Sequence, residues 1–430
     1  MSQTQYQWIR EFGKRMDSNL RSSLIHRLSV LRWIPCVMHR SAIRMIHRLS
    51  RLPVLVQLED DAVVGSAWQQ SLSNLHTPPD YYDSIRTYRM DLTPNQLQEI
   101  LTYPEVRRAY LDRKVYTLLD VASKTVEAPL AWSLDNEGQG ATIAVIDTGI
   151  HPHPDLTSPR SRILAFKDFV KGKNQPYDDN GHGTHCSGDA AGNGFSSDGK
   201  YKGPAPAAGL VGVKVLTKVG SGNLSNVIAG IQWCIDNREK YNIRIISLSL
   251  GSRSTTSYRE DPVAQITEKA WEQGIVVVAA AGNDGPDAGT ISSPGIHPRI
   301  LTVGATDDKG TPEEADDIIA PFSSRGPTSD GINKPDLVAP GTAITSLRVK
   351  GSYIDKTSPD SQVGEHYCTL SGTSMATPIV AGLAAVLLTS HPDWTPDQVK
   401  KALIDSAHDM GRPPDEQGAG CVRLDRSLLD

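Results

Sequence analysis

The pattern of apolar and polar positions divides the chain into two parts. Between residues 53 and 112, short strand-like and helix-like segments follow one another in the order strand, helix, strand, helix, strand. The strands are expected at 53–59, 85–92 and 106–112, and the helices at 62–75 and 94–102. The second helix begins at a capping box formed by Thr93 and Gln96. This order is typical of a small ferredoxin-like α/β sandwich.

Beyond residue 127 the apolar segments become continuous instead of alternating. Strands are expected at 142–146, 210–216, 243–250, 275–281 and 300–304. Helices are expected at 187–191, 224–237 and 379–388; a further helix should end at 273, and a last one should begin at 396. Continuous apolar strands separated by helices indicate a parallel sheet that is covered on both faces. Ligand sites in such sheets gather at the carboxyl ends of the strands. We therefore expect an α/β protein whose functional groups follow these strands.

The charge is unevenly distributed along the 430 residues. Of the 44 Lys and Arg residues, ten lie in residues 1–52 against two of the 49 acids, which leaves 34 basic and 47 acidic residues elsewhere. Arg40, Arg44 and Arg48 would form one stripe on a helix. The stripe is either a solvated helix face or a contact with an anionic surface. We expect three regions: a basic helical extension at 1–52, a small domain at 53–120 and a large domain at 121–430.

The cysteine content and the apolar runs bear on the compartment. Five scattered cysteines, an odd number, do not predict a disulfide framework and favour a reducing compartment. We expect no conventional signal peptide, because Arg32 and Pro35 interrupt the apolar patch at 28–38. No apolar run reaches 18 residues, so no membrane span is expected. A cytoplasmic location follows, with non-classical export as the alternative, and no specific nucleic-acid partner is indicated.

Ser374 is the residue that most needs a chemical explanation. It follows the turn Ser371-Gly372-Thr373 and precedes the apolar run 379–388, which places its hydroxyl at the N-terminus of a buried helix. Free N–H groups and the helix dipole favour negative charge there. Alone, the pattern favours a helix cap over a nucleophile. Only partners elsewhere in the chain indicate a nucleophile.

Three further segments supply such partners. Asp147 ends an apolar strand, His182 lies in Gly181-His182-Gly183-Thr184-His185-Cys186, and Asn283 ends the strand at 275–281. The order Asp, His, Asn, Ser is that of the subtilisin-type triad with its asparagine oxyanion donor. An alternative is a zinc site formed by His182, His185 and Cys186, although no fourth ligand is apparent.

These motifs, together with Lys334-Pro335-Asp336, Phe322 to Pro327 and Gly372 to Pro378, resemble those of the subtilases, the subtilisin-like serine endopeptidases, over residues 128–425. Within that family the chain most resembles the bacterial AprX-like group. The resemblance implies a parallel-sheet sandwich, hydrolysis of peptide bonds in protein or peptide substrates, and no cofactor in the chemistry. It also implies that residues 53–120 act as an inhibitory propeptide of a zymogen that cleaves itself within 115–124. The alternative is a catalytically silent subtilase fold that binds peptides.

The same resemblance assigns roles to individual residues. Asp147, His182 and Ser374 would form the catalytic triad, and Asn283 would stabilise the oxyanion. The substrate would lie between Gly220, Ser221 and Gly222 on one side and Ser249, Leu250 and Gly251 on the other, with Ala280, Ala281, Gly282 and Ser292 around the first specificity pocket. Because Ser292 is small, we expect a preference for a large apolar or aromatic side chain before the scissile bond. Asp155 matches a structural calcium ligand, although the loop 192–203 departs from the usual ligand pattern.

Overall fold

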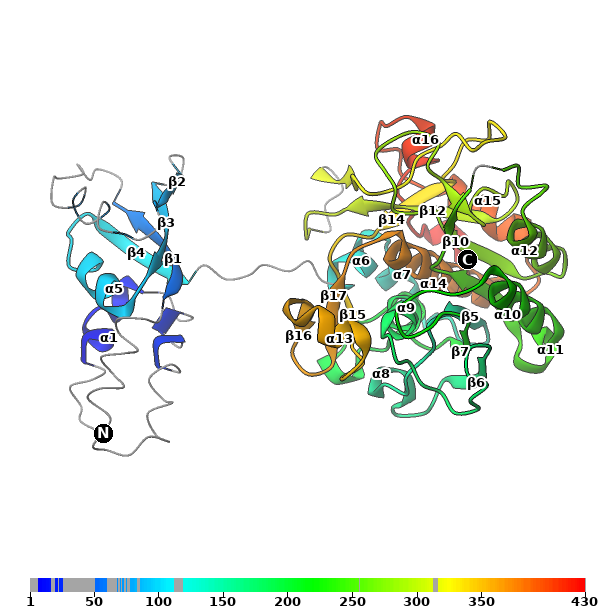
Figure 1. The fold of residues 1–430 in the computed structure, drawn as a ribbon, viewed down its shortest axis with the longest axis horizontal. Coiled ribbons are helices and arrows are strands. Elements are labelled where there is room, and N and C mark those ends of the chain that lie inside the picture. The colour runs from blue at the N-terminus through cyan, green and yellow to red at the C-terminus, as the bar shows by residue number, and fades with distance from the viewer. Residues whose placement is uncertain are drawn as a thin grey trace. The chain divides into compact units, whose positions relative to one another are not determined.

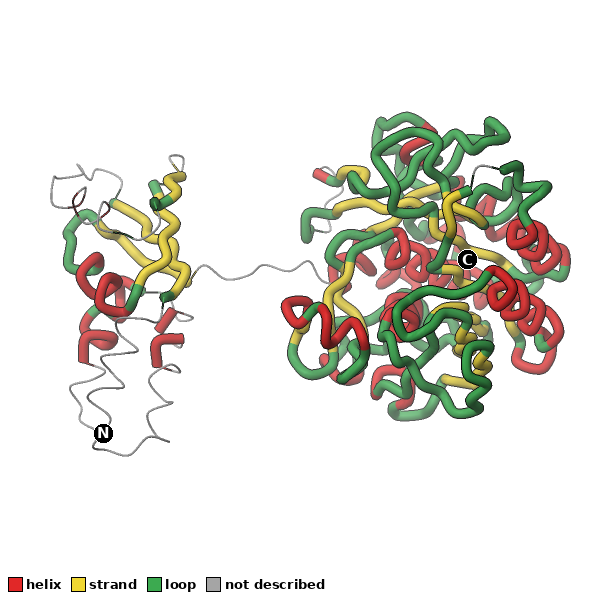
Figure 2. The backbone as a smooth tube through the Cα atoms, viewed as in Figure 1, coloured by secondary structure: helices red, strands yellow, loops and turns green. Residues whose placement is uncertain are grey.

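The structure is a computed structural model. It describes residues 7–16, 20–21, 23–25, 51–59, 68, 70, 72, 75, 78–82, 86–111, 119–254, 256–311 and 316–429. The chain forms two compact units, residues 1–115 and 116–430 (Figures 1 and 2). The boundary thus falls at residue 115 instead of 120, and residues 1–52 are not a unit of their own in this division. The Arg40 stripe and most of the helix expected at 62–75 lie outside the described residues.

The first unit is built on a four-stranded antiparallel sheet in the order β2-β3-β1-β4. Its elements are α1 (Gln7–Glu11), η2 (Gly13–Arg15), β1 (Leu52–Leu58), β2 (Asp80–Tyr82), β3 (Thr87–Leu92), α5 (Pro94–Ile100) and β4 (Val106–Leu111). The alternating burial of β1 places Val54 and Val56 in the core, as its sequence predicts. Both interactions of the capping box at Thr93 are present, which confirms the expected start of α5.

Residues from the expected N-terminal extension contribute to this same core. Trp8, Ile9, Met16, Leu20 and Leu24 are buried in one apolar cluster with residues of β1, β3, α5 and β4. Met16 also forms a bridge to Ala109 in β4. The basic segment is therefore part of the first unit at these positions, where its apolar side chains pack against the sheet.

The second unit contains an eight-stranded sheet in the order β13-β12-β10-β8-β5-β7-β6, with β14 paired to β12. The strands are β5 (Thr142–Asp147), β6 (Ile163–Asp168), β7 (Gly209–Lys214), β8 (Ile243–Leu248), β10 (Val276–Ala280), β12 (Leu301–Asp307), β13 (Ile318–Ile319) and β14 (Leu337–Pro340). All pairs are parallel except β12 with β13. The parallel sheet expected from the continuous apolar strands is thereby confirmed, and every residue of β5 and β10 is buried.

Helices and two small sheets surround the central sheet (Figure 1). The helices are α6 (Leu119–Thr125), α7 (Ala128–Trp132), α8 (Pro154–Thr157), α9 (His182–Ala191), η6 (Phe195–Ser197), α10 (Leu224–Asp236), α11 (Arg238–Tyr241), α12 (Pro262–Glu272), α13 (Tyr353–Thr357), η8 (Pro359–Ser361), α14 (Thr373–Ser390), α15 (Pro396–Asp405), α16 (Pro414–Gln417) and η9 (Arg426–Leu428). The small sheets pair β9 (Ser252–Arg253) with β11 (Ser292–Ser293), and β17 (Tyr367–Leu370) with β15 (Ile344–Leu347) and β16 (Gln362–Val363).

Helix α14 is the apolar centre of the second unit. Among the described residues it is the one helix long and apolar enough to cross a membrane, yet 83% of it is buried inside the fold. It packs beside α9 and against β8, β10, β12 and β14. Its first turn therefore lies next to the carboxyl ends of the strands, and so does the first turn of α9.

Candidate active site

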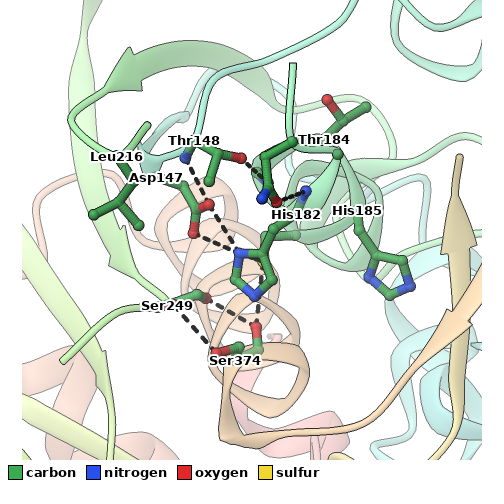
Figure 3. A network of polar contacts seen from close by, with 12 residues as sticks. Asp147, Thr148, His182, Thr184, His185, Leu216, Ser249 and Ser374 are labelled. Atoms are coloured by element: carbon green, nitrogen blue, oxygen red, sulfur yellow. Dashed lines mark hydrogen bonds and ion pairs between the residues drawn. The ribbon is translucent and has the colours of Figure 1, made fainter. Parts of the chain in front are cut away.

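Asp147 and His182 form a buried carboxylate–imidazole pair. Asp147 is the last residue of β5 and has no exposed surface, whereas 22% of the His182 side chain is exposed. His182 Nδ1 lies 2.8 Å from Asp147 Oδ1 and 3.0 Å from Oδ2. Thr148 N–H donates a further hydrogen bond of 2.6 Å to Oδ1. The carboxylate therefore fixes the ring so that its other nitrogen, Nε2, is the one available to a substrate (Figure 3).

Asp178 holds the start of α9. Its Oδ1 accepts hydrogen bonds from Asn180 N, Gly181 N and the Thr148 hydroxyl, at 3.1, 2.9 and 3.0 Å. Its Oδ2 accepts from the N–H and the hydroxyl of Thr184, at 2.9 and 2.7 Å. A helix start leaves several N–H groups without partners inside the helix, and a carboxylate there is favourable. Asp178 thereby fixes the turn that carries His182.

Gly183 allows α9 to approach β5 closely. A Cβ atom at this position would lie 2.3 Å from Gly149 O and 3.1 Å from Asp147 Cβ. Gly183 N–H also donates to the Thr148 hydroxyl at 2.9 Å. Any side chain at residue 183 would push the helix away from the strand, and with it the imidazole from its carboxylate.

The charge state of His182 is set mainly by Asp147. Burial disfavours the charged ring, but the Asp147 carboxylate outweighs this and raises the pKa of His182 above its ordinary value. The Cys186 sulfur lies 3.7 Å from His182 Nδ1. Burial raises the pKa of Cys186 to about 11, so near neutral pH this residue is an uncharged thiol. We therefore attribute the higher pKa of His182 to the carboxylate and not to the sulfur.

Ser374 is the second residue of α14 and lies below the His182 ring (Figure 3). Its hydroxyl donates to Ser249 O at 3.2 Å, and the Ser249 hydroxyl donates back to Ser374 O at 2.9 Å. Ser374 and His182 line the same cavity. Hydrogen bonds of catalytic groups are often long or misaligned without substrate. In this resting geometry, Ser374 Oγ must rotate from Ser249 O toward His182 to lose its proton.

Asn283 and the Ser374 backbone supply two neighbouring N–H donors. Asn283 Oδ1 accepts from Thr373 N at 2.9 Å and from Thr373 Oγ1 at 3.0 Å, which leaves the amide Nδ2 as the outward donor. A Cβ on Gly372 would lie 3.3 Å from Asn283 Nδ2 and 3.6 Å from Ser374 N. Both donors therefore lie within 4 Å of the position that a side chain at residue 372 would fill, and glycine leaves that position open. Two donors near one open position fit an oxyanion hole.

Two cavities adjoin Ser374. The larger, about 630 Å³, is lined by Gly220, Ser221 and Gly222 on one side and by Ser249, Leu250 and Gly251 on the other. The smaller, about 190 Å³, is lined by Ala280, Gly282, Asn283 and Ser292, and at its rim by Arg253 and Asp284, which the sequence did not point to. Ser374, Leu250 and Gly251 line both. The structure thus brings together the predicted substrate-binding residues with one exception.

Ala281 does not face the smaller cavity. It is fully buried in a cluster with Ala264, Ile291 and Ile296, and it is absent from the residues that line the two cavities in the described part of the chain. Successive side chains of an extended segment point to opposite sides. Because Ala280 and Gly282 face the cavity, Ala281 must face the core, and its assignment to the pocket wall was wrong.

The zinc alternative is not supported by the positions of the two histidines. His185 points away from Asp147 and Ser374 (Figure 3). Its Nδ1 lies 3.0 Å from Asp189 Oδ2, and its Nε2 lies 3.2 Å from both Ile344 O and Cys368 O. Asp147, His182 and Cys186 do lie close enough to hold a metal ion. His182 Nδ1 and the Asp147 carboxylate already bind each other. Because His185 binds other groups through both of its ring nitrogens, His182 and His185 do not form a metal pair.

The residues around Asp155 do not fit the calcium ion expected there. Asp155 Oδ1 accepts from Ser196 N at 3.0 Å, and Oδ2 accepts from the Tyr367 hydroxyl at 2.7 Å. Burial raises the pKa of Tyr367, with a further contribution from Asp155, so the hydroxyl keeps its proton. Calcium requires several oxygen lone pairs, whereas these neighbours direct hydrogens at the carboxylate. The loop 192–203 thus supplies a donor where a cation site needs acceptors.

The fold and this constellation define a class of protein. The family model described as the subtilase family matches residues 138–420. Because this match covers more than half of the chain, the chain belongs to the subtilase family. It is a serine protease.

Individual relatives narrow the comparison. Serine protease AprX of Bacillus subtilis (strain 168) is 43% identical over an alignment of 441 positions, which covers 98% of each chain. M-protease of Shouchella clausii (strain KSM-K16) is 32% identical, over 85% of this chain and 84% of its own. Subtilisin Savinase of Lederbergia lenta is 37% identical, over 66% of this chain and 90% of its own. The full-length match confirms the predicted resemblance to the AprX-like group.

A solved structure agrees with this assignment. The S41 psychrophilic protease matches with a TM-score of 0.57 and 32% sequence identity, over 67% of this chain and 93% of its own. The match therefore leaves about a third of the chain without a counterpart in that structure.

Proposed function

We propose that the chain hydrolyses peptide bonds through Asp147, His182 and Ser374, with Asn283 as oxyanion donor. The observation that carries this proposal is the 2.8 Å contact of His182 with the buried Asp147 carboxylate, together with the cavity that His182 and Ser374 both line. His182 Nε2 takes the proton of the Ser374 hydroxyl while Oγ attacks the substrate carbonyl carbon. Asp147 stabilises the imidazolium that forms. The chemistry uses no cofactor.

The negative charge of the tetrahedral intermediate develops on the former carbonyl oxygen. Asn283 Nδ2 and Ser374 N–H donate to that oxygen, and Thr373 keeps the amide turned in the required sense. His182 then returns its proton to the leaving amine, and the acyl group stays on Ser374. Water attacks this ester by the same route in reverse, which regenerates the serine.

The substrate is an extended peptide held between residues 220–222 and residues 249–251, which line the larger cavity. Main-chain hydrogen bonds to such segments give affinity with little demand on sequence, so specificity is broad. The 190 Å³ cavity takes the side chain before the scissile bond, the P1 side chain. Leu250 and Ala280 supply apolar surface to this cavity, and the small Ser292 also lines it. We expect Leu, Phe, Tyr or Met at P1.

The first unit acts as the inhibitory propeptide in this proposal. The chain separates into units at residue 115, and the expected self-cleavage segment, 115–124, begins at this boundary. Residues 119–124 belong to α6, which Ser123 anchors by a hydrogen bond of 2.7 Å to Lys202 O. Cleavage before α6 would release the first unit without removing that anchor.

One experiment tests both parts of the proposal. The purified chain and Ser374→Ala are analysed by intact mass and by N-terminal sequencing, and both are assayed on tetrapeptide p-nitroanilides that differ only at P1. We expect a shortened wild-type chain, an intact variant, and cleavage by the wild type alone with Phe or Leu at P1. Two intact chains would refute self-processing. A strict preference for Arg or Lys would refute the P1 assignment.

A further inference from the structure

The larger cavity has an apolar wall that comes from an unexpected part of the chain. Strands β15 and β17 are antiparallel partners, yet residues 348–366 lie between them instead of a short turn. Within this segment, Tyr353 and Ile354 line the cavity beside Asn180 and His182. The Tyr353 side chain is one of the few large apolar groups in the described residues that is substantially exposed, at 37%. An exposed aromatic residue at the rim of a substrate cavity needs an explanation.

The segment is fastened to the loop that carries His182. Tyr353 N–H donates to Asp179 O, and Ile354 N–H donates to Asn180 O, both at 3.0 Å. Asp179 is itself paired with the buried ammonium of Lys214 at 2.8 Å. The position of the wall relative to His182 is therefore fixed by backbone contacts and does not depend on the Tyr353 ring.

The segment is also braced from within, around Asp355. Its carboxylate accepts from Arg348 Nε at 2.5 Å, from Gly351 N at 2.7 Å and from Gln362 Nε2 at 3.0 Å. Arg348 Nη1 in addition donates to Gly364 O at 2.8 Å. A wall whose support is hydrogen-bonded in this way can present two side chains in a constant geometry, which selectivity requires.

Strand geometry decides which substrate residue meets this wall. In an extended peptide, successive side chains point to opposite sides. If P1 occupies the cavity at Ser292, then P2 and P4 point to the other side, into the larger cavity. Leu224, Val227 and Val263 line one part of that cavity, and Tyr353 and Ile354 line the part beside His182. P2 is one residue removed from the reacting bond, whereas P4 is three residues removed, so of the two side chains the P2 side chain lies nearer to His182.

We propose that Tyr353 and Ile354 determine specificity at P2 and select an apolar side chain there. The inference rests on the proposed role of Ser374 and on the assignment of the Ser292 cavity to P1. Removing the wall exposes the P2 side chain to water in the transition state and lowers kcat/KM for apolar P2 residues. Substrates with glycine at P2 have no side chain to lose this contact, so they respond little.

The test uses the peptides succinyl-Ala-Ala-X-Phe p-nitroanilide with X as Leu, Phe, Gly or Asp. Wild type, Tyr353→Ala, Ile354→Ala, Tyr353→Lys and a control, Lys356→Ala, are compared by kcat/KM. Lys356 is exposed on the same helix and does not line the cavity. We expect each alanine variant at 353 or 354 to lower the Leu-to-Gly ratio about fivefold, and the control to leave it unchanged. Tyr353→Lys should raise the Asp-to-Leu ratio by at least as much.

The outcomes separate this inference from the proposed function. A Leu-to-Gly ratio that stays within twofold of wild type in both alanine variants, with P1 dependence intact, overturns the P2 assignment alone. If Tyr353→Lys leaves the Asp-to-Leu ratio of kcat/KM unchanged, the P2 assignment is also overturned. This result does not depend on the loss of a contact. If none of the peptides is cleaved by wild type, or if cleavage persists in Ser374→Ala, the proposed function fails and the inference fails with it.

Discussion

Helix α9 carries two histidines that each pair with a carboxylate but differ in the surroundings of their second ring nitrogen. His182 faces Asp147 at 2.8 Å and His185 faces Asp189 at 3.0 Å, in each case through Nδ1. The Nε2 atom of His185 meets two backbone carbonyls at 3.2 Å inside the core. His182 instead lines the substrate cavity and keeps part of its side chain exposed.

The difference shows what makes a carboxylate–histidine pair catalytic. Both pairs orient an imidazole, so orientation by itself does not define a base. Only at His182 is the second nitrogen left for a reacting proton, with the Ser374 hydroxyl in the same cavity. At His185 the same chemistry holds α9 to β15 and β17 through Ile344 O and Cys368 O. The following substitutions separate these roles.

Replacing each histidine should give opposite results. His182→Ala should lower kcat by about 10⁶-fold, the loss known for the corresponding histidine of subtilisin, a member of this family. His185→Gln should leave kcat per active site nearly unchanged but lower the free energy of unfolding by about 3 kcal/mol, because buried Asp189 loses its partner. Denaturant unfolding and active-site titration measure the two effects. Equal losses of kcat in both variants would contradict the distinction.

Asp147→Asn should have the next largest effect. An amide can donate to His182 Nδ1 and so favours the wrong tautomer, in which Nε2 carries a proton and cannot accept one from Ser374. We expect kcat to fall by about 10⁴-fold, as for the equivalent change in a serine protease of another fold. Steady-state kinetics on one peptide substrate suffice. A loss below tenfold would show that Asp147 does not control the tautomer.

Asn283→Ala removes one oxyanion donor and should lower kcat by about 10²- to 10³-fold with little change in KM. This range comes from the corresponding asparagine of subtilisin. Thr373→Val keeps the shape of the side chain but removes one of the two hydrogen bonds that orient the amide, so its effect should be smaller and in the same parameter. A change confined to KM in either variant would place Asn283 in substrate binding instead.

The acid limb of the activity profile should report His182. The base must be neutral, and Asp147 raises the pKa of His182 above its ordinary value of about 6.5. Activity is therefore present at high pH and is lost as the pH falls through this raised pKa, so the midpoint lies above 6.5. A profile of kcat/KM against pH provides the value. A midpoint below 6.5 would mean that burial, which acts in the opposite sense, outweighs the carboxylate.

The parts of the molecule that local pattern encodes were predictable. Strands β5, β7, β8, β10 and β12 were expected within a few residues, and the capping boxes at Thr93 and Thr395 are both formed. Strands β6, β14 and β15 were not expected. The four residues proposed for the chemistry lie in short motifs, and the order of these motifs along the chain is specific. Helix α9 begins at His182 and not at Ser187 as expected. Asp178 accepts hydrogen bonds from backbone N–H groups at this helix start, and the glycine-rich sequence by itself does not predict this partner.

The contacts that sequence did not predict join distant segments. Tyr367 donates to Asp155 across 212 positions, and no local pattern places a phenol beside that carboxylate. Tyr353 and Ile354 lie in a polar segment with no motif, and only the fold brings them to His182. Likewise Ala281 was misplaced because the strand end was treated as a uniform wall, whereas its alternation decides which side chain faces the cavity.

The proposed mechanism requires that His182, and not His185, activates Ser374. Labelling with a fluorophosphonate, followed by peptide mapping by mass spectrometry, tests this directly in wild type, His182→Ala and His185→Gln, each checked for folding by circular dichroism. We predict a single modified residue, Ser374, at similar rates in wild type and in His185→Gln, and no labelling in His182→Ala. Labelling of Ser374 at the wild-type rate in folded His182→Ala, or labelling at another residue, would contradict the account.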